Sequence, residues 1–150
     1  MKIRKIKKSD WKKILELWQN IPGMGLNNID DSKDGIIRFL KRNPKTCFIA
    51  EENGTAAGTI IAGHDGRRGY IYHTSVLPEF RRRGIATELL ASAVDALKKQ
   101  GIAKAALVVF SDNEIGNAFW EKQGFTKRTD LVYRNKVITE KEMIRNRKEE

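Results

Sequence analysis

The chain has little cysteine, little proline and few aromatic residues: 1 Cys, 3 Pro and 8% Phe, Trp and Tyr among 150 residues. A single cysteine, Cys47, cannot form an internal disulfide, and its apolar neighbours predict a buried thiol in a reducing compartment. No apolar run approaches the roughly 20 residues of a membrane span. The N-terminus also lacks the apolar core of a signal peptide. We therefore expect a cytoplasmic protein with no membrane partner.

Basic residues dominate the charge. Lys and Arg number 29 against 19 Asp and Glu, which gives a net charge of +10 and favours anionic partners. The charge alone leaves open a nucleic acid, a phosphorylated cofactor, an acidic acceptor or a merely solvated surface. The scarcity of aromatic residues gives no stacking stripe for nucleic acid, and no helix-turn-helix or zinc-ligand spacing is present. We expect neither a nucleic-acid partner nor a metal site.

Hydrophobic periodicity predicts one mixed α/β domain. An antiparallel meander is expected to feed a βαβ unit, with about four helices flanking the sheet. The apolar segment 104–110 indicates a buried parallel strand. We place the domain at residues 1–138 and expect 139–150 to be a helical or flexible tail. The predicted strands cover residues 1–6, 46–51, 55–63, 69–76, 104–110 and 128–138, and the predicted helices begin after residue 9 or 10, after residue 31 or 32, and near residues 85 and 113.

A basic loop over residues 81–86, Arg-Arg-Arg-Gly-Ile-Ala, joins the strand at 69–76 to the next helix. A helix start leaves backbone N–H groups free and carries partial positive charge. Gly84 allows the backbone to approach a phosphate closely, and the arginines add charge. The pattern predicts an anion site, although an ordinary basic helix cap has the same composition.

Two segments resemble the GNAT family of N-acetyltransferases. Residues 76–86, Val-Leu-Pro-Glu-Phe-Arg-Arg-Arg-Gly-Ile-Ala, are similar to its motif A, whose core is Gln/Arg-x-x-Gly-x-Gly/Ala. Residues 113–125, Asn-Glu-Ile-Gly-Asn-Ala-Phe-Trp-Glu-Lys-Gln-Gly-Phe, are similar to its second signature, in which an Asn is followed seven residues later by a Tyr and then by Glu-Lys-x-Gly-Phe. The element order resembles the family from residue 1 to about 138. The chain looks most like a bacterial branch similar to ribosomal-protein N-terminal acetyltransferases.

This resemblance implies a GNAT fold and an enzyme that moves an acetyl group from acetyl-CoA to a primary amine. The acceptor would be a peptide or protein N-terminus or a small amine, attacking directly in a ternary complex without an acyl-enzyme. Two alternatives stay open: a protein lysine acetyltransferase, and a noncatalytic CoA-sensing or nucleic-acid-binding module on the same fold. We expect a monomer or a homodimer.

The resemblance also implies which residues bind acetyl-CoA. Backbone N–H groups of the basic loop would hold the pyrophosphate, and the end of the preceding strand would pair with the pantetheine arm as an added strand. The Asn of the second signature would contact the same arm. The positions carried over are Thr74, Ser75, Val76, Arg81, Arg82, Arg83, Gly84, Ile85, Ala86, Thr87, Asn113 and Trp120.

Trp120 stands where the family usually has a tyrosine that protonates the departing thiolate. An indole N–H cannot serve as that acid. A thiol pKa of about 8.5 means that a free thiolate at pH 7 costs only about 2 kcal/mol, so a dedicated acid is not essential. We interpret Trp120 as a wall of the cofactor channel, with plain core packing as the alternative.

The catalytic base is the second departure, because the strand at 69–76 contains no carboxylate. Neutralising an ε-amine at pH 7 costs about 4.6 kcal/mol, against about 1 for an α-amine. His73 is the candidate base, since imidazole titrates near pH 6.5; a packing histidine remains the alternative. Tyr72 is the second catalytic candidate. Strict alternation places Tyr72 and Thr74 on one face and His73 on the other, unless a bulge intervenes.

The connection between the first two helices, residues 20–34, is where acceptor specificity would lie by the same resemblance. Its carboxylates Asp30, Asp31 and Asp34 could attract a cationic amine, or could simply cap the second helix.

A backbone N–H near Ser75 or Val76 is expected to stabilise the oxyanion of the tetrahedral intermediate.

Overall fold

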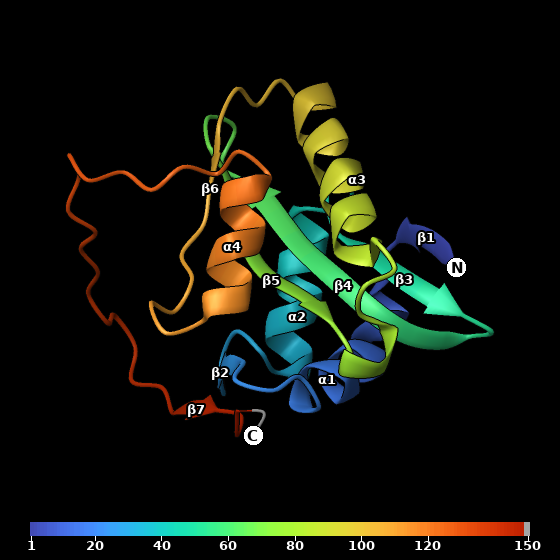
Figure 1. Cartoon of the computed structure of the whole chain (residues 1–150). Coiled ribbons are helices and arrows are strands. Elements are labelled where there is room, and N and C mark those ends of the chain that lie inside the picture. The colour runs from blue at the N-terminus through green and yellow to red at the C-terminus, as the bar shows by residue number, and fades with distance from the viewer. Residues whose placement is uncertain (149–150) are drawn as a thin grey trace.

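Five strands form one mixed sheet in the computed structural model, which describes residues 1–148. The strand order is β1-β3-β4-β5-β6, antiparallel throughout except for the parallel pair β5–β6. Four helices accompany the sheet, as predicted (Figure 1). The strands of this sheet are β1 (Lys2–Lys5), β3 (Phe48–Glu52), β4 (Thr55–His64), β5 (Gly69–Val76) and β6 (Ala105–Ala106), and the helices are α1 (Trp11–Gln19), α2 (Lys33–Arg42), α3 (Ile85–Lys99) and α4 (Glu114–Lys122).

The sheet is covered on both faces, and each face has its own apolar core. Helices α1 and α2 lie behind the sheet in Figure 1, whereas α3 and α4 lie in front of it. Strand β4 supplies both cores in alternation: Ile60 packs in the α3 core and Ile61 in the α1–α2 core. This alternation buries β4 on both sides and makes it the central strand. None of the helices formed by residues 1–148 is long and apolar enough to cross a membrane.

The turns follow the predicted chemistry. Asn53 and Gly54 join β3 to β4 with φ of 52° and 78°, the left-handed backbone that an Asn-Gly hairpin requires. Ser32 caps α2, since its Oγ accepts the N–H of Gly35 at 3.1 Å. The β3–β4 hairpin and the start of α2 are therefore set by local sequence.

The C-terminal third differs from prediction. The strand expected over 104–110 is reduced to Ala105–Ala106, and Val108 and Phe110 are 56% and 47% exposed. The strand expected over 128–138 is not formed: those residues extend away from the domain without regular structure (Figure 1). Beyond the two residues of β6, apolar side chains of the expected strand therefore lie at the surface.

Part of the tail is a strand rather than a helix. Within residues 139–148, β7 (Met143–Arg145) pairs antiparallel with β2 (Gly25–Asn27), in the connection between α1 and α2. Arg145 strengthens the attachment, since its Nε donates to the carbonyl of Gly23 at 2.8 Å. The helical or flexible tail predicted from sequence is thus not found at β7. The domain limit at residue 138 stays a prediction.

Candidate active site

Strands β5 and β6 part soon after they meet. Their pairing is limited to Gly69 with Ala105 and Tyr70 with Ala106, so residues 71–76 of β5 have no described strand on that side. Leu77 donates its N–H to Ala57 of β4 at 2.9 Å. Since N–H directions alternate along a strand, the N–H groups of Val76 and Thr74 point to the unpaired edge.

Thr74 carries a second unmet hydrogen-bonding group. Its hydroxyl is buried and has no hydrogen-bond partner within the described residues. A buried hydroxyl without a partner is destabilising, and such groups usually meet a water or a ligand. The end of β5 therefore offers polar backbone and side-chain groups to an extended molecule.

The basic loop leads directly from this edge to α3. A short 3-10 turn, Pro78–Phe80, follows β5, after which Arg82 and Gly84 both adopt left-handed backbone with φ of 64° and 75°. Gly84 is the N-cap of α3 and brings no side chain to accept the first N–H groups of the helix. Nothing lies within 4 Å of a Cβ placed on Gly84. An open helix start with uncapped N–H groups suits an anion.

Two of the loop arginines have defined contacts. The Nε of Arg81 donates to the carbonyl of Val76 at 3.4 Å. Arg83 lies 3.3 Å from the carboxylate of Glu52 and 5.2 Å from the ring centroid of Phe80. Arg81 is thereby held at the end of β5, whereas Arg83 is directed towards the end of β3.

A β-bulge interrupts β5 between this edge and the strand's beginning. Ile60 of β4 pairs with Thr74, and Ala62 pairs with Ile71, so two residues of β5 face one of β4. The two are Tyr72 and His73. The extra residue turns both side chains to the α1–α2 face and moves Thr74 to the α3 face. The prediction from strict alternation, which placed Tyr72 and His73 on opposite faces of the sheet, is therefore wrong.

The aromatic contacts place both side chains on that face. The Tyr72 ring lies 5.5 Å from the ring of Phe39 in α2, and the His73 ring lies 4.6 Å from that of Trp18 in α1. Burial, followed by the charge of Asp30, raises the pKa of Tyr72. A phenol is already a weaker acid than a thiol, so this shift disfavours proton transfer from Tyr72 to a thiolate.

His73 pairs with a carboxylate that the sequence did not assign to it. Its Nε2 lies 2.8 Å from Oδ1 of Asp31, and the two side chains are 22% and 6% exposed. The other oxygen of Asp31 accepts the backbone N–H of Asn27 at 2.7 Å. Asp31 was expected to attract the acceptor or cap α2, but Ser32 makes that cap. The residues are 42 positions apart, and no sequence pattern links them.

The residues of the second signature have structural partners. Asn113 caps α4, with its Oδ1 accepting the N–H of Gly116 at 2.9 Å. Trp120 is partly buried between Phe119 and Phe125, whose ring centroids lie 5.0 Å and 5.1 Å away. These contacts agree with the packing interpretation of Trp120; a role of either residue in cofactor binding stays a prediction.

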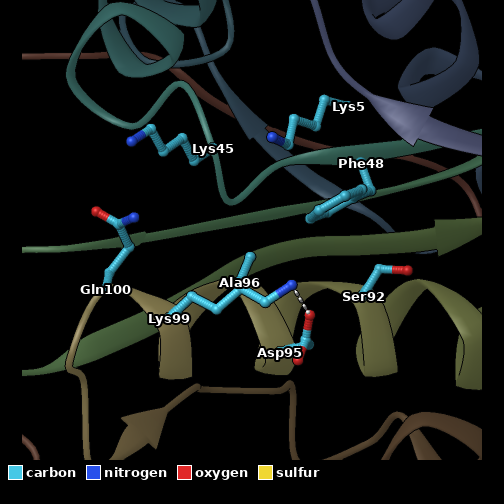
Figure 2. Close-up of a pocket in the computed structure, with 8 residues that line it drawn as sticks. All are labelled: Lys5, Lys45, Phe48, Ser92, Asp95, Ala96, Lys99 and Gln100. Carbon is cyan, nitrogen blue, oxygen red and sulfur yellow. Dashed lines mark ion pairs between the residues drawn. The ribbon is translucent and has the colours of Figure 1, made fainter.

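A separate pocket of about 260 Å³ lies beside the C-terminal half of α3. Figure 2 shows its three lysines and the ion pair between Lys99 and Asp95, 2.9 Å apart. None of the residues predicted for the active site lines this pocket. It is lined by Lys5, Lys45, Phe48, Ser92, Asp95, Ala96, Lys99 and Gln100.

The single thiol lies in the α1–α2 core. Cys47 is 1% exposed, and burial raises its pKa to about 12. Since the thiolate is the reactive form, native protein in mildly alkaline buffer is expected not to react with dithionitrobenzoate, whereas unfolding in guanidinium should release one reactive thiol. Rapid reaction of the native thiol with dithionitrobenzoate, accompanied by loss of activity, would contradict this burial. It would also make Cys47 a candidate for forming an acyl-enzyme.

Known proteins are similar to this chain in sequence and in fold. A model of the acetyltransferase (GNAT) family matches residues 11–125. An acetyltransferase of Photorhabdus laumondii is 33% identical over 144 residues, spanning 95% of this chain and 99% of that protein. The aminoglycoside N-acetyltransferase AAC(6')-Iy, in complex with a CoA bisubstrate analogue, has a TM-score of 0.71 at 23% identity, over 91% of this chain and 97% of that one. The ribosomal-protein-S18-alanine N-acetyltransferase from Escherichia coli has a TM-score of 0.68 at 22% identity, over 85% and 79%.

The solved structures agree on the fold, and they include the ribosomal-protein enzymes that the sequence resembles. The family model covers most of the chain, and the Photorhabdus relative spans almost all of it. Both findings agree with the two signatures around the basic loop and α4. The chain therefore belongs to the acetyltransferase (GNAT) family, and it is an acetyl-CoA-dependent N-acetyltransferase.

Proposed function

We propose that acetyl-CoA lies along the unpaired edge of β5, with its pyrophosphate at the start of α3. The observation that carries this proposal is the continuity of the two features: the edge left by β6 leads into an uncapped, glycine-started helix. The unpartnered Thr74 hydroxyl and the N–H groups of Thr74 and Val76 would meet the pantetheine arm. The remaining residues proposed to contact the cofactor are Ser75, Arg81, Arg82, Arg83, Gly84, Ile85, Ala86, Thr87, Asn113 and Trp120.

His73 is the proposed base for the attacking amine. It accepts the proton as the amine nitrogen bonds to the thioester carbon, and a backbone N–H donates to the developing oxyanion. Between Ser75 and Val76, the alternation along β5 favours Val76, whose N–H faces the unpaired edge. Collapse of the intermediate breaks the C–S bond and releases CoA thiolate, which takes a proton from solvent. Tyr72 stays a second catalytic candidate, as a hydroxyl that would hydrogen-bond to the substrate rather than as the acid.

The proposed acceptor is a peptide or protein N-terminus or another weakly basic amine. An α-amine is deprotonated at pH 7 for about 1 kcal/mol, a task within reach of one imidazole, whereas a lysine ε-amine costs about 4.6. Strand β5 offers no carboxylate of its own. The rival acceptor is a protein lysine side chain.

A matched set of peptides tests the acceptor. Release of free thiol from acetyl-CoA is measured with a peptide that has a free N-terminus and no lysine, and with the same peptide N-acetylated and carrying one lysine. We expect turnover with the first peptide and at least ten times less with the second, given the difference in deprotonation cost. Turnover confined to the second peptide would overturn the proposal in favour of the lysine acetyltransferase.

The cellular setting stays a set of predictions. A single buried thiol suits the cytoplasm, and we retain the monomer or homodimer and the exclusion of nucleic acid as expectations. Small amines such as aminoglycosides and polyamines belong in the same thiol-release measurement, because the structural relatives include an aminoglycoside N-acetyltransferase.

A further inference from the structure

We propose that Asp31 is a positioning residue for the reaction: its carboxylate holds the His73 ring with the hydrogen on Nε2 and leaves Nδ1 as the basic nitrogen. This inference rests on the proposed function, in which His73 accepts the proton of the attacking amine. It adds a residue from the connection between α1 and α2 to the chemistry of β5.

The carboxylate of Asp31 is held from two sides. Oδ1 meets Nε2 of His73 at 2.8 Å, and Oδ2 accepts the N–H of Asn27 at 2.7 Å. The backbone closes the same turn, since the N–H of Asp31 donates to the carbonyl of Asn27 at 3.2 Å. A side chain that is 6% exposed and bonded at both oxygens has little freedom to rotate.

The imidazole ring is held on a second side by Trp18. The two ring centroids are 4.6 Å apart and the ring planes meet at 65°. Trp18 is itself immobile: it is 2% exposed, and its Nε1 donates to Thr59 Oγ1 at 3.0 Å. The Thr59 hydroxyl lies 3.2 Å from that of Ser75, two residues beyond His73 on β5. Asp31 and Trp18 together fix the orientation of the ring.

This orientation decides which nitrogen can act as a base. A neutral imidazole has one N–H and one lone-pair nitrogen, and an ionised carboxylate can only accept. Nε2 therefore bears the hydrogen. Nδ1 has no hydrogen-bond partner among residues 1–148, and the side chain is 22% exposed, which leaves Nδ1 as the nitrogen for the acceptor to meet. A second-neighbour carboxylate selects the tautomer of catalytic histidines in this way.

The same hydrogen bond persists after proton transfer. When His73 takes a proton on Nδ1 it becomes an imidazolium ion, and its Nε2–H still donates to the Asp31 carboxylate. A purely structural ion pair would have the same distances. The chain contains such a pair for comparison, Arg4 with Asp10, at 2.8 Å and with Asp10 only 7% exposed.

Nitrogen NMR of the full-length protein tests the tautomer without any mutation. The chain has two histidines, so the His73 ring can be assigned by comparison with a His64→Gln protein. With the ring neutral, we expect the hydrogen on Nε2 and a bare Nδ1. A hydrogen on Nδ1 in the wild-type protein would overturn the proposal, whatever the activity of any variant.

Kinetics of Asp31→Asn then separate positioning from structure. We expect kcat to fall about 10–100-fold with the KM for acetyl-CoA unchanged. The amide introduced by Asp31→Asn can donate to Nε2, so the hydrogen of the neutral ring is no longer held on that nitrogen. Asp31→Glu should recover part of the rate. Asp10→Asn is the matched control: it removes an equally buried carboxylate and should lower thermal stability without changing kcat.

The outcomes distinguish this inference from the proposed function. An Asp31→Asn protein with wild-type kcat and an unchanged His73 tautomer would overturn the positioning role alone. Equal loss of rate in Asp31→Asn and Asp10→Asn, tracking loss of folded protein, would do the same. A His73→Gln protein with the wild-type rate would instead rule out His73 as the base. The NMR spectrum of the wild-type protein would still report the tautomer of the ring.

Discussion

Acetyl transfer by a His73→Gln variant is expected to fall about 10²–10⁴-fold in kcat, the usual contribution of a positioned general base. Glutamine is polar and can hydrogen-bond to Asp31, but it cannot accept the amine proton. The KM for acetyl-CoA should change little, because the bulge of β5 turns His73 towards α1 and α2 and away from the α3 face. The measurement is thiol release with a free α-amine acceptor at saturating acetyl-CoA.

His64→Gln provides the matched control for this experiment. His64 is the other histidine of the chain, at the end of β4, where its Nδ1 accepts the N–H of Gly66 at 3.0 Å. Its replacement should leave kcat unchanged. Retention of the wild-type rate by the His73 variant would exclude it as the base and leave solvent or the substrate's own amine equilibrium to supply the neutral nucleophile.

Replacing Gly84 by valine is expected to weaken acetyl-CoA binding by about 10–100-fold. The φ of 75° at this position is strained for a β-branched residue, and relaxation would move the first N–H groups of α3. Hydrogen bonds from those groups to a charged phosphate contribute about 1.5–3 kcal/mol each, and every 1.4 kcal/mol is a factor of ten in affinity. Calorimetric titration with CoA measures the loss directly.

The opposite end of the same helix supplies the control. Gly101 follows α3 with φ of 81°, and nothing lies within 4 Å of a Cβ placed there, as at Gly84. Gly101→Val should therefore lower stability to a similar degree and leave the dissociation constant of CoA unchanged. Equal weakening in both variants, or none in Gly84→Val, would argue against a pyrophosphate site at the start of α3.

Local sequence determined much of this protein. The Asn53-Gly54 hairpin, the Ser32 cap and the glycine at the start of α3 each form with the backbone that their residue types favour. The bounds of β5 are those predicted, and the two signatures identified the family that the comparisons show. These features depend on interactions within a few residues, so they can be predicted from the sequence without knowledge of the fold.

Tertiary structure alone decided which groups face one another. The bulge that places Tyr72 and His73 on one face depends on the register between β4 and β5, and the pairing of His73 with Asp31 joins a strand to a distant turn. The length of β6 depends on which strands lie beside it, and the apolar run 104–110 does not specify those neighbours. Long-range register and burial are properties of the packed molecule, and no local pattern in the chain encodes them.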